Sequence, residues 1–186
     1  DAKFVDRTEA TGRLGLFGEK AGEILDDVGS FDRPAKGLAR YQGTWGEIAG
    51  CGVIVQAIPL VGEGLGYELF LDSSELADVW KVLSESANVR PIGSDALERL
   101  RVEAGVPRFG VELDTSIIPL EASLDEAISY TKGCYLGQEI SARLDSRGTP
   151  RHLLRTLVLS PDARVPELGA GIEGSDGKSI GEVRSA

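Results

Sequence analysis

The order of its apolar segments constrains the fold of this chain more than any other feature of the sequence. Short apolar runs within residues 3–17 suit one or two strands, and apolar residues at helical spacing follow within 19–28. Residues 52–58 and 67–71 have the pattern of two buried strands, and a helix is predicted over 73–87. Strand, helix, strand, strand, helix is the split β-α-β-β-α pattern, so we expect an α+β fold with a ferredoxin-like domain.

The segments between and after these elements read as loops and further helices. Residues 30–46 are rich in Gly, Pro and Arg and are expected to form a loop. A helix is predicted over 94–104, followed by a mostly irregular stretch over 105–137 and a short helix over 138–144.

The period of the pattern changes near Arg151. Residues 153–159 alternate with period two, and the turn Ser175–Gly177 lies between two glycine-rich strand candidates. We therefore expect two domains, 1–150 and 151–186, of which the second is a small β-barrel module that lacks its closing strands.

Acidic residues outnumber basic ones, at 30 against 20, which gives a net charge of -10. This balance weighs against non-specific binding to nucleic acid or to an anionic membrane. The sequence has no stretch of ~20 apolar residues, so no membrane span is expected. Two cysteines, Cys51 and Cys134, cannot build a disulfide framework, which favours a cytoplasmic protein.

The shortage of certain residue types restricts the chemistry. The single histidine, His152, excludes most zinc sites and most histidine-based acid–base sites. Two cysteines 83 positions apart cannot hold a metal by themselves, so no metal site is predicted. The remaining candidates are carboxylates, Arg and Lys, one reactive thiol, or a bound cofactor.

Two charged residues lie on faces of their helix or strand that the rest of the fold is expected to cover. Arg101 lies in the inward stripe of its helix, four residues after Leu97, where it needs a carboxylate or an anionic ligand. Glu68 lies on the strand face opposite Tyr67, where a covered carboxylate needs N–H donors. The alternatives are an arginine that reaches solvent along the helix edge and a solvated strand face.

Residues 131–139 (TKGCYLGQE) hold the densest chemical signal. Cys134 lies two residues after Lys132 and just before a predicted helix, and both a cation and a helix N-terminus favour the thiolate. The alternative is a buried, inert thiol between two turn glycines. Downstream, basic residues recur every four positions and form a candidate positive patch: Arg143, Arg147, Arg151 and Arg155. Such a patch would suit an anionic tail or RNA, and the alternative is an ordinary solvated face.

Three segments resemble the YgfZ/GcvT family of folate-binding proteins: residues 100–110 (LRVEAGVPRFG), 118–122 (IPLEA) and 132–139 (KGCYLGQE). That family contains the T-protein of the glycine cleavage system, an aminomethyltransferase, and YgfZ-type proteins that support iron–sulfur cluster assembly or repair. The cysteine-containing run is similar to the YgfZ branch, because T-proteins lack the cysteine.

The resemblance implies a tetrahydrofolate site at the centre of a ring of subdomains. Residues 66–68 resemble the T-protein G-[FY]-E motif, whose acid holds the pterin, so Glu68 and Tyr67 become cofactor-binding candidates. The family's helix arginine aligns with a leucine here, and Arg101, one turn away, is the expected substitute. Gln138 and Glu139 complete the cofactor-binding set. The T-protein catalytic aspartate belongs to an N-terminal region that this chain is expected to lack.

Three functions follow from this resemblance. The first is a tetrahydrofolate-binding YgfZ-type protein in which Cys134, with Lys132 beside it, acts as the functional thiol for iron–sulfur assembly proteins or client enzymes. The alternatives are a folate-dependent aminomethyltransferase and an RNA-binding protein linked to tRNA modification. The first hypothesis requires Glu68 and Cys134 to face a shared hollow shaped for a pterin.

Overall fold

The computed structural model describes residues 2–61, 64–86, 88–148 and 150–186. The chain forms two compact units, Asp1–Ala104 (unit 1) and Gly105–Ala186 (unit 2). The domain boundary predicted near Arg151 falls inside unit 2 and stays a prediction.

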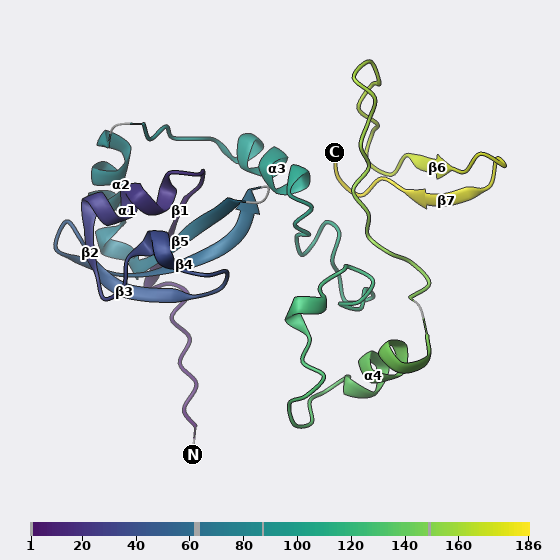
Figure 1. The fold of residues 1–186 in the computed structure, drawn as a ribbon, viewed down its shortest axis with the longest axis horizontal. Coiled ribbons are helices and arrows are strands. Elements are labelled where there is room, and N and C mark those ends of the chain that lie inside the picture. Colours follow the sequence, from purple (N-terminus) through teal and green to yellow (C-terminus); the bar gives the residue numbers. More distant parts are fainter. Residues whose placement is uncertain (1, 62–63, 87, 149) are drawn as a thin grey trace. The chain divides into compact units, whose positions relative to one another are not determined.

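Unit 1 is built on one antiparallel sheet (Figure 1). Its strands are β1 (Thr11–Leu16), β2 (Gly29–Phe31), β3 (Gly43–Ile48), β4 (Cys51–Val61) and β5 (Gly64–Asp72). Their order is β1-β5-β4-β3-β2, and every neighbouring pair is antiparallel. The predicted strands 52–58 and 67–71 are thus confirmed as β4 and β5, while Gly62 and Glu63 of the predicted turn lie outside the described residues.

Strands β2 and β3 correct the prediction of a loop over residues 30–46. The glycines of β3 give it a weak strand propensity, but the strand pairs with β4 from Gly43 to Ile48. On its other side, Gly46 lies against Phe31 of β2, where a side chain would collide. Pairing between strands, which sequence propensity does not measure, decides the conformation here.

Helices cover one face of the sheet. Unit 1 contains α1 (Ala21–Val28), α2 (Leu76–Glu85), α3 (Ser94–Glu103) and the 3-10 turns η1 (Ala35–Gly37) and η2 (Ser73–Glu75). Side chains of α1 and α2 join those of the strands in one core, whose largest fully buried members are Leu25, Ile48, Val53, Val55, Leu69 and Val79. Sheet and helices together confirm the α+β class.

Strand β5 has two different faces. Tyr67, Leu69 and Leu71 are buried in the core, whereas Glu68 and Phe70 point to the other face and are half-buried. This alternation is the ordinary period of a strand, and it confirms the predicted separation of Glu68 from Tyr67.

Unit 2 has less regular structure. It contains η3 (Asp125–Ala127), α4 (Gln138–Arg147), and a hairpin of β6 (Gly171–Glu173) and β7 (Ser179–Glu182). The hairpin encloses the predicted turn at Ser175–Gly177. Residues 153–159 form no strand, which corrects the expectation from their alternation: in the described part of unit 2 no strand pairs with them, and Leu153 and Leu157 are exposed.

Candidate functional site

Glu68 lies at the centre of β5, on the face that α1 and α2 do not cover. Its side chain is 23% exposed, and its Oε1 is 3.5 Å from Nη1 of Arg13, whose side chain is 66% exposed. Its neighbours in register are Gln56 on β4 and Gly15 on β1. The carboxylate is therefore neither buried in the core nor fully solvated, and a ligand can reach it.

An apolar row lies beside Glu68 on the same face. Phe70, Ile54 and Trp45 stand directly opposite one another on β5, β4 and β3. Trp45 is 65% exposed, and a Cβ added at Gly52 would meet open space. The face therefore offers flat apolar side chains next to a carboxylate, an arrangement that suits a planar ring with N–H donors.

Tyr67 belongs to the opposite face. It is 4% exposed, and its Oη lies 2.6 Å from the position that a Cβ on Gly22 of α1 would take. Burial, with a smaller contribution from the Asp26 carboxylate, raises the pKa of the Tyr67 hydroxyl. Tyr67 thus packs α1 against the sheet, and its role at a ligand stays a prediction.

Arg101 lies on α3 and is buried, at 5% exposure. It forms an ion pair with Glu98, three residues earlier on the same helix. The predicted inward position and carboxylate partner are confirmed, and the solvent-exposed alternative is wrong. Contact with a ligand stays a prediction.

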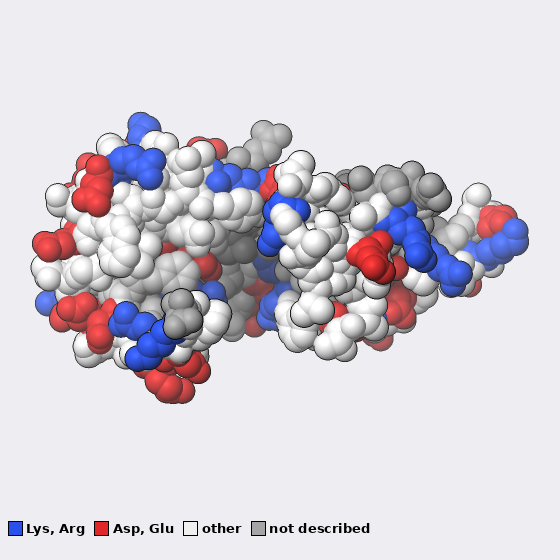
Figure 2. Space-filling view, turned by 90° about the horizontal axis from the view of Figure 1, so that it is seen from below, with Lys and Arg blue, Asp and Glu red and all other residues white. Residues whose placement is uncertain are grey.

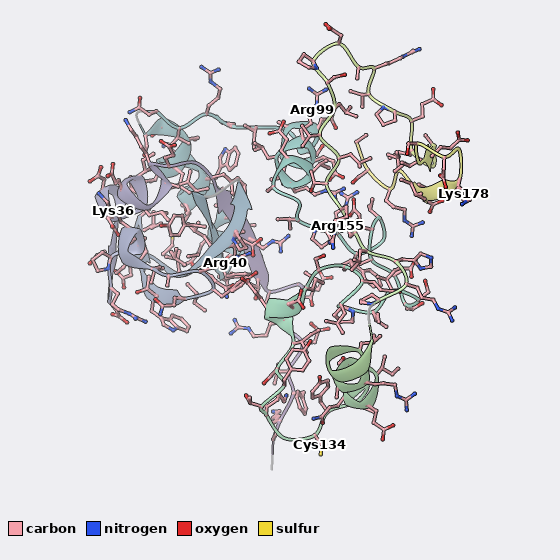
Figure 3. The ribbon with its side chains drawn as sticks, turned by 45° about the vertical axis from the view of Figure 1, so that its right-hand side comes forward. Lys36, Arg40, Arg99, Cys134, Arg155 and Lys178 are labelled. Atoms are coloured by element: carbon pink, nitrogen blue, oxygen red, sulfur yellow. The ribbon has the colours of Figure 1, made fainter. Side chains whose placement is uncertain are left out.

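In unit 2, Cys134 lies at the bend before α4 and is an exposed free thiol (Figure 3). The alternative of a buried thiol is therefore wrong. The Nζ of Lys132 lies 5.5 Å from the centroid of the Tyr135 ring. Gly137, with φ 85°, ends the bend in the left-handed region, and α4 begins at Gln138 as predicted. Gln138 is half-buried and Glu139 is exposed.

A cavity of about 360 Å³ lies next to this bend. Apolar side chains form most of its wall, together with Lys132 and Tyr135, and they include Ile118, Ile128, Leu136 and Ile140. Cys134 is not part of the wall. Glu68 belongs to unit 1 and Cys134 to unit 2. The hollow for a pterin that both side chains were predicted to face therefore stays a prediction.

The described members of the arginine series differ in their surroundings. Arg143 and Arg151 are exposed, and Arg155 donates to Oγ of Ser123 at 3.1 Å, while the side chain of Arg147 lies outside the described residues. Basic and acidic side chains are interspersed on the face shown in Figure 2. Binding of RNA to this series stays a prediction.

Gln56, Trp45 and Arg13 were not among the predicted site residues. A polar residue inside the otherwise apolar segment 52–58 was the only signal for Gln56. Among the described residues, no group of three His, Cys, Asp or Glu side chains is placed to hold a metal ion, and no helix is long and apolar enough to cross a membrane.

Comparison with known proteins relates this chain to one family. The family model of the GCVT N-terminal domain matches residues 1–132. The chain is 32% identical to an aminomethyltransferase of Streptomyces avermitilis over 192 residues, covering 100% of this chain and 50% of that protein. It is 31% identical to aminomethyltransferases of Lysinibacillus sphaericus (98% of this chain, 49% of the relative) and Moorella thermoacetica (95% and 47%). The chain thus spans about half the length of the curated relatives it matches.

Proposed function

The chain belongs to the family of the GCVT N-terminal domain, and from this membership we propose that its protein binds a reduced folate and transfers to it the one-carbon unit of an aminomethyl group, while the amine leaves as ammonia. The names of its relatives favour this activity over the YgfZ-type role expected first from the sequence. The observation that carries the proposal is the position of Glu68, a reachable carboxylate beside an apolar row.

The residues of this face fit a pterin. The Glu68 carboxylate can accept hydrogen bonds from neighbouring N–H groups of the ring, and Phe70 and Trp45 offer apolar surface for its flat sides. Tetrahydrofolate, when bound, supplies the nitrogen that accepts the one-carbon unit. The part of this chain is to bind and orient the ring.

The remaining predicted residues keep their proposed roles. Arg101, Gln138 and Glu139 would contribute to folate binding, and Lys132 would favour the thiolate of Cys134. Tyr67 would act indirectly, by fixing β5 against α1. We further propose that unit 1 is the ferredoxin-like subdomain of the family fold and that residues 151–186 belong to a C-terminal β-barrel module.

One observation favours a second function. Cys134 is exposed in the run that is similar to the YgfZ branch, so a role in iron–sulfur cluster assembly or repair is a second proposal. It is tested separately. If Cys134→Ser lowers the activity of iron–sulfur enzymes in the host but leaves folate binding intact, the thiol serves this second role; unchanged enzyme activities would exclude it.

Calorimetric titration of the complete protein with tetrahydrofolate tests the main proposal. Glu68→Gln should weaken binding by about 1–3 kcal/mol, because the charged acceptor is lost. Glu47→Gln, on the same face of β3, is the matched control and should leave the affinity unchanged. Absence of binding by the unmodified protein, or equal affinities of all three proteins, would contradict the proposal.

A further inference from the structure

Gln56 stands directly opposite Glu68 in the register of β4 and β5. Directly opposed residues of antiparallel strands share a face, with Cβ atoms about 4.5–5.5 Å apart. The same row continues to Gly15 on β1 and to Gly43 on β3. The row therefore holds one carboxylate and one amide side by side, with glycines at its outer positions.

Aromatic and apolar groups border this row. The ring of Phe17 lies over Gly15 and Gly66, at 2.5 Å from where a Cβ on either would be placed. On the other side runs the row of Phe70, Ile54 and Trp45. A polar pair between apolar borders matches a flat heterocycle that has a hydrogen-bonding edge.

The amide of Gln56 is held only on one side. Its Nε2 donates a long hydrogen bond of 3.5 Å to the carbonyl of Tyr41. The backbone of Tyr41 is itself held in place, because its N–H donates to the carbonyl of Ala57 at 2.8 Å. Within the part of the chain that the structure describes, this is the only hydrogen bond of the amide. A second N–H and the Oε1 acceptor thus remain for a ligand.

We propose that Gln56 is a specificity-determining residue that recognises the 4-oxo group of the pterin. Its free N–H donates to the 4-oxo oxygen, while Glu68 accepts from the adjacent N3–H and 2-amino groups. This inference rests on the proposed folate binding and adds the residue that selects the ring. A 4-amino pteridine presents a donor where the 4-oxo form presents an acceptor, so the amide N–H disfavours it.

Titrations of the complete protein with tetrahydrofolate and with its 4-amino analogue test this role. Gln56→Met keeps the length of the side chain but removes the donor, and it should lower the affinity for tetrahydrofolate about tenfold, the effect of one hydrogen bond. The affinity for the 4-amino analogue should change less than about threefold. Gln56→Glu, which offers only acceptors when ionised, should shift the preference further towards the 4-amino analogue.

The ratio of the two affinities separates recognition from a structural role, because a loss of fold weakens both ligands alike. Glu47→Gln is the control on the same face and should leave the ratio unchanged. An unchanged ratio in both Gln56 variants, together with weaker binding by Glu68→Gln, would overturn this inference and leave folate binding standing. Failure of the unmodified protein to bind tetrahydrofolate would overturn both.

Discussion

The two cysteines have different surroundings, although both are free thiols. Cys51, at the start of β4, is 6% exposed and its S–H donates weakly to the carbonyl of Ala49 at 3.9 Å. Burial raises the pKa of the Cys51 thiol, and the negative charges of Glu75 and Asp78 raise it further. A raised pKa means a smaller fraction of thiolate at any given pH, and the thiolate is the reactive form.

Alkylation should therefore distinguish the two thiols. At pH 8, iodoacetamide should modify Cys134 and leave Cys51 largely unmodified, whereas both should react in urea. Mass spectrometry of the intact protein and of its peptides measures this order. Equal labelling of both thiols in the native protein would contradict the buried position of Cys51.

Single residues were predictable where a repeating pattern fixes their direction. The period of β5 placed Glu68 opposite Tyr67, and the period of α3 placed Arg101 inward. Gln56 could not be assigned in this way. Its neighbour across the sheet depends on the register of two strands, and register is set by turns and by packing of the whole face.

At the scale of elements, the close approach of α1 to the sheet depends on Gly22. A Cβ at this position would lie 2.6 Å from Oη of Tyr67 and 2.7 Å from Cα of Lys36, which belongs to η1. The second of these atoms is backbone and cannot turn aside as a side chain can. The helix would have to move away from β5.

Gly22→Ala should consequently destabilise the protein by about 1–3 kcal/mol, the usual effect of an overpacked core. Gly52→Ala is the matched control, because an added Cβ there meets no atom within 4 Å. Urea unfolding followed by circular dichroism measures both. A Gly22→Ala protein as stable as the control would show that α1 is not in close contact with the sheet.

Elements with a strong apolar pattern were predicted well, and those that depend on a distant partner were not. The segments of α1, α2, β4 and β5 carry their periodicity in their own residues. Strand β3 forms because β4 lies beside it, and residues 153–159 form no strand although they alternate. A strand forms only where it can pair with another strand, so predicting it requires knowledge of its partner.

At the scale of the molecule, the two units differ in how much of their backbone is in regular hydrogen-bonded structure. Unit 1 has a five-stranded sheet with a helix-covered core, whereas the described part of unit 2 has one helix of ten residues, a short 3-10 turn and a two-stranded hairpin. Amides at the centre of a covered sheet exchange only after large-scale opening.

Native-state hydrogen exchange should reveal this difference. The amides of β4 and β5 around Val55 and Leu69 should exchange slowest, and those of residues 150–170 should exchange fastest, because few of them are bonded to backbone carbonyls. Mass spectrometry of peptides from the exchanged protein gives the comparison. Protection of 150–170 as strong as that of β5 would contradict the sparse backbone hydrogen bonding of this segment.

The alternation along β5 also bears on how such a chain can change over generations. Tyr67, Leu69 and Leu71 are buried in the core and are constrained by folding, whereas Glu68 and Phe70 lie on the face that α1 and α2 do not cover and are constrained by what binds there. Selection can therefore alter the chemistry of one strand without disturbing its stability. A lineage in which this face met a different ligand would keep the first set and be free to replace the second.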